Sequence, residues 1–139
     1  MANERVIVLR GTPTIDEQNL CGATAITPGM LIDISTGAWV PHPDSAVGAV
    51  VFALERDELG NDIDTDYVET DVVKAGYFHM GERANALVAS GETISEGDQL
   101  EAGASGLLVG GTTAGQIVGV AAEDIDTTSG QARGAVIVQ

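Results

Sequence analysis

A short phrase that occurs twice constrains the fold of this chain more than any other feature. Residues 26–40 read ITPGMLIDISTGAWV and residues 94–109 read ISEGDQLEAGASGLLV. Both copies begin with isoleucine, carry glycine three positions later and end on valine, and the second has one extra residue. Two copies about 70 residues apart indicate a domain built from two related halves, because a solenoid needs three or more stacked units.

Each copy of the phrase opens with turn chemistry. In Thr27-Pro28-Gly29 the proline ring fixes φ at the second turn position, and glycine tolerates the positive φ required at the third. Ser95-Glu96-Gly97 has glycine at the same position. We expect strands at residues 31–34 and 99–102, followed by Ser-Thr-Gly and Ser-Gly turns that reverse the chain. The sequence therefore predicts a β-hairpin in each half.

Short clusters of valine and isoleucine, each bounded by turn residues, predict an all-β fold. No stretch keeps a 3.6-residue apolar period with caps, and residues 14–20 are the nearest candidate for one short helical turn. We therefore expect a small β-barrel or sandwich made of two related halves, with an extended N-terminal arm. The clusters are residues 6–9, 49–52, 72–73, 117–118 and 135–138.

A length of 139 residues predicts one domain. We divide it into an N-terminal arm or entry segment (1–25), a first half (26–56), an acidic connector (57–66) and a longer second half (67–139). Cys21 is the single cysteine, so an intrachain disulfide is impossible, and we expect it to fill apolar space.

The charge balance restricts the partners of the chain. Twenty-one acidic residues against six basic ones give a formal net charge of −15. Nucleic acid and anionic membranes need a basic surface, so neither is expected as a partner, whereas a positively charged protein would be attracted. The start of the chain lacks the apolar core of a signal peptide, and no apolar run reaches the ~20 residues of a membrane span. We expect a soluble protein.

Three alternating aspartates in the connector form a weak candidate cation loop. Asp62, Asp64 and Asp66 have the spacing of the first ligands of an EF-hand, which also requires Gly at position 6 and Glu at position 12. Tyr67 and Val73 occupy those positions. A solvated acidic loop is therefore the favoured interpretation, a weak Ca²⁺ or Mg²⁺ site is the alternative, and no cofactor is expected.

Catalytic patterns find no support in the sequence. His42 and His79 have no partner at metal-ligand spacing, no Gly-x-Ser-x-Gly elbow is present, and no lysine follows the glycine-rich stretches. The segment 91–100 resembles a turn of lipoyl and biotinyl carriers, but the only lysine, Lys74, follows a Val-Val strand. We predict no enzyme and no catalytic residue. A cation-binding adhesion module and a barrel-sandwich carrier or accessory domain stay open as alternatives.

An apolar run near the N-terminus is the candidate partner-binding segment. One interpretation, which we favour, is a buried strand of the domain itself. The other is an arm that adds a strand to a partner's sheet edge, with flanking arginines that contact acidic groups. The candidate residues are Arg5, Val6, Ile7, Val8, Leu9 and Arg10.

Four segments occur in an order that is similar to a known family. They are DVVKAG (71–76), ALVASGETISEGDQLE (86–101), IVGVAAED (117–124) and RGAVIV (133–138). This succession resembles the capsid decoration proteins, also called cement or head-stabilisation proteins, of tailed bacteriophages and related viruses. The resemblance covers roughly residues 67–139, and the first half joins it through the internal repeat.

The resemblance implies a structural role. Such a protein is made in the host cytoplasm and binds the major capsid protein on the outside of an assembled icosahedral shell, commonly as a homotrimer. It would brace the capsid and carry no enzymatic activity.

Overall fold

The computed structural model describes residues 6–139, and these form an all-β fold. Fourteen short strands and two single-turn 3₁₀ helices make up the described part. The strands are β1 Val8–Arg10, β2 Thr14–Asp16, β3 Leu20–Cys21, β4 Ile32–Ser35, β5 Ala38–Pro41, β6 Val51–Ala53, β7 Ala75–Tyr77, β8 Arg83–Val88, β9 Thr93–Ile94, β10 Gln99–Ala102, β11 Leu108–Gly110, β12 Ile117–Ala121, β13 Ile125–Asp126 and β14 Ala132–Val138. The helices are η1 Asp57–Leu59 and η2 Ala104–Gly106. The prediction of an all-β class is confirmed.

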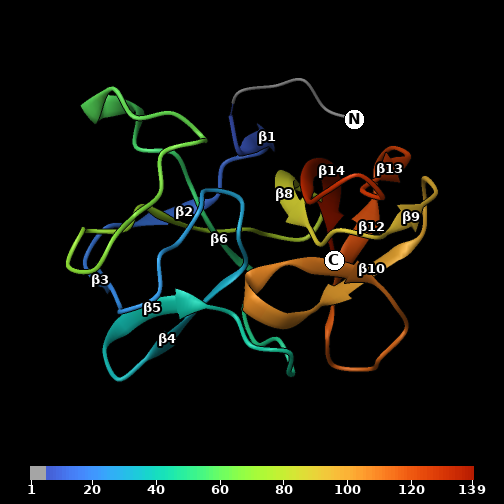
Figure 1. The fold of residues 1–139 in the computed structure, drawn as a ribbon, viewed down its shortest axis with the longest axis horizontal. Coiled ribbons are helices and arrows are strands. Elements are labelled where there is room, and N and C mark those ends of the chain that lie inside the picture. The colour runs from blue at the N-terminus through green and yellow to red at the C-terminus, as the bar shows by residue number, and fades with distance from the viewer. Residues whose placement is uncertain (1–5) are drawn as a thin grey trace.

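A closed five-stranded barrel forms one side of the molecule (Figure 1). Its strands follow the order β8-β11-β10-β12-β14, and β14 pairs again with β8. The closing pair is antiparallel over six residue pairs, from Ala132↔Val88 to Ile137↔Arg83. The β11–β8 contact is parallel and rests on one pair, Leu108↔Val88. Closure leaves no free edge between these strands, and side chains fill a barrel this small.

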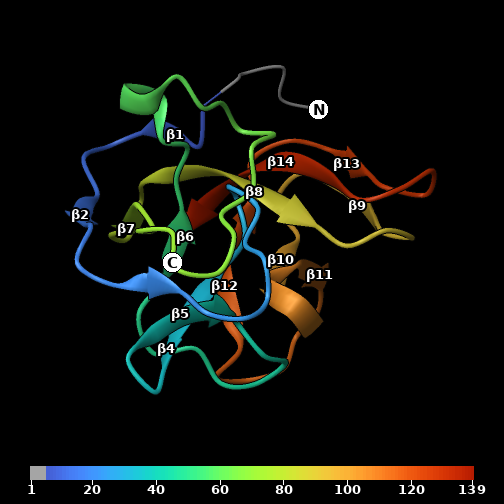
Figure 2. The same ribbon diagram turned by 60° about the vertical axis from the view of Figure 1, so that its left-hand side comes forward.

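A smaller lobe lies beside the barrel and carries two three-stranded sheets (Figure 2). One has the order β2-β7-β6 and the other β3-β5-β4. A two-stranded ribbon, β13-β9, extends from the barrel on the other side. The barrel and the smaller lobe have one hydrophobic cluster each.

The two hydrophobic clusters draw on residues from most of the chain. The barrel cluster runs in sequence from Ile7 to Val138 and includes Leu31 and Phe52 of the first half, both fully buried. The second cluster surrounds Trp39 in the smaller lobe. Because the barrel core needs side chains from both halves, the halves stabilise one another.

The repeated phrase forms the same local structure in both copies. In the first, the Met30 N–H donates to the Thr27 carbonyl at 3.0 Å, and in the second Asp98 donates to Ser95 at the same distance. Gly29 and Gly97 have φ of 98° and 92°, as the third residue of a type II turn requires. Hairpins β4–β5 and β10–β11 follow. The predicted hairpins are confirmed, but the first lies in the smaller lobe and the second in the barrel wall.

A third copy of this turn lies at residues 68–71, where the sequence gives no glycine. The Asp71 N–H donates to the Val68 carbonyl at 3.0 Å, and the Asp71 carboxylate accepts the Val68 N–H at 2.9 Å. In the second copy the Asp98 carboxylate accepts the Ser95 N–H at 2.9 Å, which is the same arrangement. Thr70 holds the glycine position with φ of 74°. Because threonine stands at the position that is glycine in the other two turns, comparison of the repeated phrases did not reveal the third turn.

Residues 14–20, the nearest candidate for a helical turn, form no helix. Thr14–Asp16 forms β2 against β7, and Leu20–Cys21 forms β3 parallel to β5. These segments pair with strands more than 15 residues away in the sequence. Pairing with these distant strands therefore had more influence on the structure of residues 14–21 than their local propensity.

Candidate functional site

The described part of the N-terminal segment belongs to the domain's own sheet. Ile7 is fully buried, and its carbonyl accepts the Asn85 N–H at 2.7 Å. Val8 then pairs with Ala84 as β1 joins β8. The Ile7 N–H donates to the Glu55 carboxylate at 2.8 Å, and burial raises the pKa of Glu55 more than this hydrogen bond lowers it. The described segment thus pairs with β8 of its own domain, and Ile7 is its one buried residue.

The outer edge of β1 still offers a place for a partner strand. β1 is the terminal strand of its sheet in the described chain, so one of its edges has no strand beside it. Val6 is about half exposed and Arg10 is exposed, whereas Val8 and Leu9 are partly buried. Arg5 lies outside the described residues. Partner binding by this segment stays a prediction.

The aspartates of the candidate cation loop take part in local structure. One Asp62 carboxylate oxygen accepts the Asp64 N–H at 2.9 Å and the Thr65 hydroxyl at 3.4 Å. The Asp64 carboxylate lies 3.4 Å from Arg133, which also donates to the Pro28 and Ile63 carbonyls. Within residues 6–139, no group of three or more His, Cys, Asp or Glu side chains is placed to hold a metal ion.

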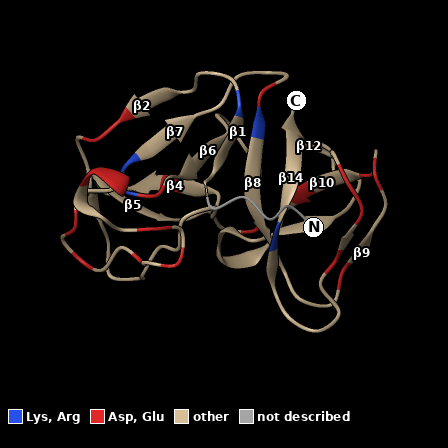
Figure 3. Ribbon diagram, turned by 90° about the horizontal axis from the view of Figure 1, so that it is seen from above, with Lys and Arg blue, Asp and Glu red and all other residues tan. Residues whose placement is uncertain are grey.

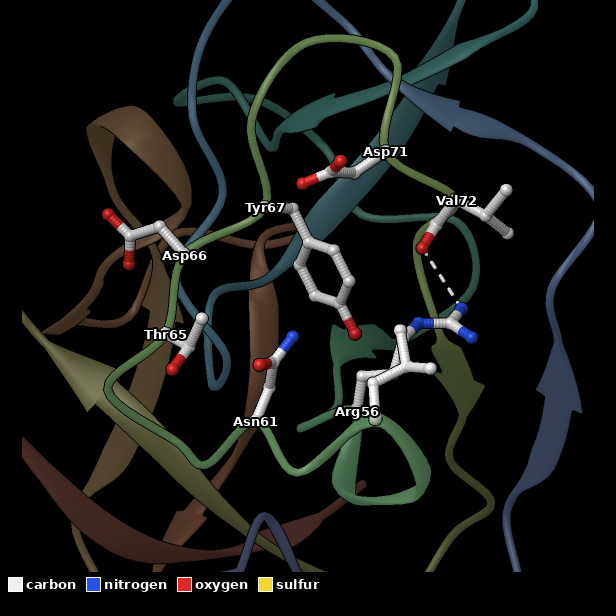
Figure 4. A pocket seen from close by; sticks show the side chains of 8 residues that line it. Arg56, Asn61, Thr65, Asp66, Tyr67, Asp71 and Val72 are labelled. Carbon is white, nitrogen blue, oxygen red and sulfur yellow. Dashed lines mark hydrogen bonds between the residues drawn. The ribbon is translucent and has the colours of Figure 1, made fainter.

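A surface pocket lies next to this loop, and sequence reasoning did not find it (Figure 4). It has a volume of about 310 Å³ and is formed between the end of the acidic connector and the third turn. Its lining combines apolar, acidic, basic and uncharged polar side chains. They are Arg56, Leu59, Asn61, Thr65, Asp66, Tyr67, Asp71 and Val72.

Tyr67 occupies the centre of this pocket and fixes its inner wall (Figure 4). Its side chain is buried, and its hydroxyl donates to the Leu54 carbonyl at 2.7 Å and accepts the Lys74 N–H at 3.3 Å. Burial is the largest influence on the Tyr67 hydroxyl and raises its pKa. The phenol is therefore neutral at pH 7, and its role in the pocket is structural.

Arg56 lines the pocket, but its charge is already matched within the chain. One terminal nitrogen lies 3.2 Å from the Glu17 carboxylate and 3.1 Å from that of Glu58. The other donates to the Val72 carbonyl at 2.9 Å, the bond drawn in Figure 4. The guanidinium thus joins the start of the connector to Glu17, which follows β2, and to Val72, which follows the third turn.

Lys74 is also paired beside the pocket. Its ammonium lies 3.2 Å from Glu58 and 3.5 Å from Asp57. Burial alone would lower the pKa of Lys74, but Glu58 and Asp57 raise it by more. The lysine is therefore charged and held by η1, which is unlike the exposed hairpin-tip lysine that the carrier alternative requires.

The described residues contain no assembled catalytic group. His42 is buried and its ring contacts the Pro43 carbonyl, whereas His79 contacts Glu82. Cys21 is buried, and burial is the main reason that its pKa is raised. Over residues 6–139 no hydrogen bond joins a serine, threonine or cysteine to a histidine.

Acidic positions far outnumber basic ones along the ribbon seen from above (Figure 3). Aspartates and glutamates lie mainly on the connecting loops at both ends of the molecule, and basic positions are few. In the described chain no helix has the length and apolar character needed to cross a membrane.

The fold defines a small all-β domain with a closed barrel, and comparison with known proteins agrees with this class. No family model and no curated protein sequence matches the chain. Among solved structures, the chain is similar to the N base of the head fiber gp8.5 of bacteriophage phi29. The TM-score is 0.62 at 15% identity, and the match covers 91% of this chain and 95% of the other. At this identity the likeness establishes a shared fold.

Proposed function

We propose that this chain is a non-enzymatic structural protein of a bacteriophage virion, associated with the head. The observation that carries the proposal is the fold likeness to the base of a phage head fiber, which extends over nearly the whole of both chains. A match of this extent concerns the complete domain, since it includes the barrel and the smaller lobe together. The ordered resemblance of residues 71–138 to capsid decoration proteins supports the same assignment independently.

We further propose that the protein binds the outer surface of the capsid, through the major capsid protein, and stabilises it. A compact domain with two hydrophobic clusters loses little conformational entropy when it docks. Many copies on one shell, or three copies joined as a homotrimer, would gain affinity through multivalency. The net charge of −15 would favour basic regions of a head protein and disfavour the packaged DNA.

Co-sedimentation with capsids tests the proposal. The probe is empty expanded capsids assembled from the major capsid protein encoded in the same genome, and capsids of an unrelated phage are the control. We expect saturable binding at a fixed number of copies per capsomer on the cognate shell only. No binding, equal binding to both shells, or a genome without a capsid gene would contradict the assignment.

The oligomeric state and the stabilising role are measured separately. Light scattering of the purified chain should give the mass of a trimer if the protein docks as a homotrimer. Calorimetry of cognate capsids with and without the chain should show a higher melting temperature when it is bound, because a ligand of the native state stabilises that state. Capsids whose melting is unchanged at saturation would show a protein that binds the head without stabilising it.

A further inference from the structure

We infer that the pocket beside Tyr67 is a docking site for a basic side chain, arginine or lysine, on a segment of a neighbouring head protein. This inference rests on the proposed function for the identity of the partner. The binding chemistry itself comes from the pocket, which combines apolar walls with the carboxylates of Asp66 and Asp71, and among the described residues its one basic side chain, Arg56, forms its ion pairs with Glu17 and Glu58 instead.

The apolar walls suit the aliphatic stem of such a side chain. Leu59 is 67% exposed and Val72 is 39% exposed, and both line the cavity. Leu20, which is 43% exposed, forms a β-bridge with Val72 and continues the apolar surface outside the pocket. Long basic side chains lay their methylene groups on surfaces of this kind and keep the charged end near polar groups.

The polar part of the pocket is negative. Asp71 projects toward the side of the Tyr67 ring, and Asp66 stands at the rim and points outward (Figure 4). Asp71 accepts the Val68 N–H, which orients the carboxylate without neutralising it. Arg56 is paired with Glu17 and Glu58 and therefore does not neutralise these aspartates. A guanidinium or ammonium group at this position would form charge-assisted hydrogen bonds.

Charge complementarity favours a different protein over a second copy of this chain as the partner. The described residues include five basic side chains. Arg56, Lys74 and Arg133 are each paired with carboxylates of their own chain, and Arg56 itself lines the pocket. A second copy would bring its own excess of acidic residues to the same site, whereas a basic segment of another protein offers charge complementarity.

A direct test titrates the labelled protein with N-acetyl-L-arginine amide and follows backbone amide resonances by NMR. The matched probe is N-acetyl-L-citrulline amide, which has nearly the same shape but no charge. We expect the arginine compound to shift resonances of residues 56–72 with saturation in the millimolar range, and the citrulline compound to bind at least about tenfold more weakly. Equal shifts from both compounds, or shifts spread over the whole surface, would overturn the inference.

The second and third turns provide a matched pair of variants. Asp66→Asn with Asp71→Asn removes two charges at the pocket, and an asparagine at position 71 can still accept the Val68 N–H. Glu96→Gln with Asp98→Asn removes two charges from the second turn, where Asp98 makes the equivalent bond to Ser95. We expect the pocket variant to lose the arginine response and the control to keep it. Equal losses in both variants would show a general effect of net charge.

A second pair tests the apolar wall. Leu59→Ser should weaken the arginine response, while Met80→Ser, at a position that is 85% exposed and does not line the pocket, should leave it unchanged. Thermal melting of all four variants establishes that each is folded before binding is compared.

Capsid co-sedimentation separates this inference from the proposed function. We expect the pocket variant of residues 66 and 71 to bind cognate capsids about tenfold more weakly than the control variant. Unchanged capsid binding by the pocket variant would refute the docking role and leave the virion assignment intact. Specific arginine binding by a protein that ignores capsids would refute the virion assignment and leave the basic-side-chain site intact.

Discussion

At the scale of single residues, the three related turns differ in how well their third residue suits a positive φ. Glycine adopts φ near 90° without strain at positions 29 and 97, whereas Thr70 has a branched Cβ at φ of 74°. A left-handed conformation costs an L-residue about 1–2 kcal/mol, and β-branching adds to the cost. The third turn is thus held by its surroundings, through hydrogen bonds such as Thr70 N–H to the Cys21 carbonyl at 3.1 Å.

We expect Thr70→Gly to raise the free energy of unfolding by about 0.5–1 kcal/mol, because relief of strain exceeds the extra freedom that glycine gives the unfolded chain. Gly97→Ala is the reverse experiment: its Cβ would meet no atom within 4 Å, so conformation alone should lower the stability by about 1 kcal/mol. Urea titrations measure both. A Thr70→Gly variant less stable than the parent would mean that the threonine side chain contributes more than its backbone costs.

At the scale of the element, β1 provides a test of whether the N-terminal segment is core or arm. Ile7 is fully buried in the barrel cluster, whereas its neighbour Val6 is 46% exposed. Ile7→Ala should therefore destabilise the domain by about 2–4 kcal/mol through lost burial and a cavity, and Val6→Ala by less than about 0.5 kcal/mol. Thermal and urea unfolding compare the two. If both substitutions lowered the stability by similar, small amounts, the segment would be a detachable arm and not part of the core.

Glu82 connects β8 to the loop after β1 and should make this contact depend on pH. Its carboxylate accepts the Thr12 N–H at 2.6 Å and the His79 N–H at 2.8 Å. Burial alone would raise the pKa of Glu82, but these bonds and the His79 ring lower it below its ordinary value of 4.5. A lowered folded-state pKa stabilises the protein above the unfolded value, and the contribution disappears as pH falls through the folded value.

The expected outcome is that Glu82→Gln lowers the Tm at pH 7, and that the difference from the parent shrinks as pH falls below 4.5. Both proteins carry His79→Gln, so that protonation of the neighbouring imidazole does not contribute. Calorimetry between pH 7 and pH 2.5 measures the difference. A difference that stays constant over this range would show that the charge of Glu82 has no part in stability.

Sequence reasoning identified elements where local chemistry specifies structure and missed those that depend on distant pairing. Pro28-Gly29 and Gly97 specify their turns locally, and the hairpins follow from them. Strands of two or three residues, such as β3, carry too little pattern to be recognised. The pocket was missed for the same reason, because Arg56 and Val72 meet only when the connector folds back, and Thr70 conceals the turn that supports them.

At the scale of the whole molecule, the excess of acidic residues destabilises the folded state. A net charge of −15 on 139 residues produces self-repulsion, which destabilises the compact state. The described ion pairs are few, and the acidic loops extend over both ends of the molecule (Figure 3). The two hydrophobic clusters therefore offset the repulsion between the acidic residues and keep the domain folded.

Salt should accordingly act in opposite directions on folding and on binding. Screening lengths fall from roughly 20 Å or more at 20 mM salt to about 4 Å at 0.5 M, so repulsion between surface carboxylates is largely removed. We expect the Tm to rise by several degrees over this range of NaCl, measured by circular dichroism.

Binding to the arginine compound and to capsids should weaken over the same range, because it depends on attraction between unlike charges, which salt screens as it screens repulsion. A Tm that falls with salt would mean that the few ion pairs around Arg56 and Lys74 outweigh the general repulsion. Capsid binding that strengthens with salt would place its origin in apolar contacts such as those of Leu59 and Val72, and not in the carboxylates.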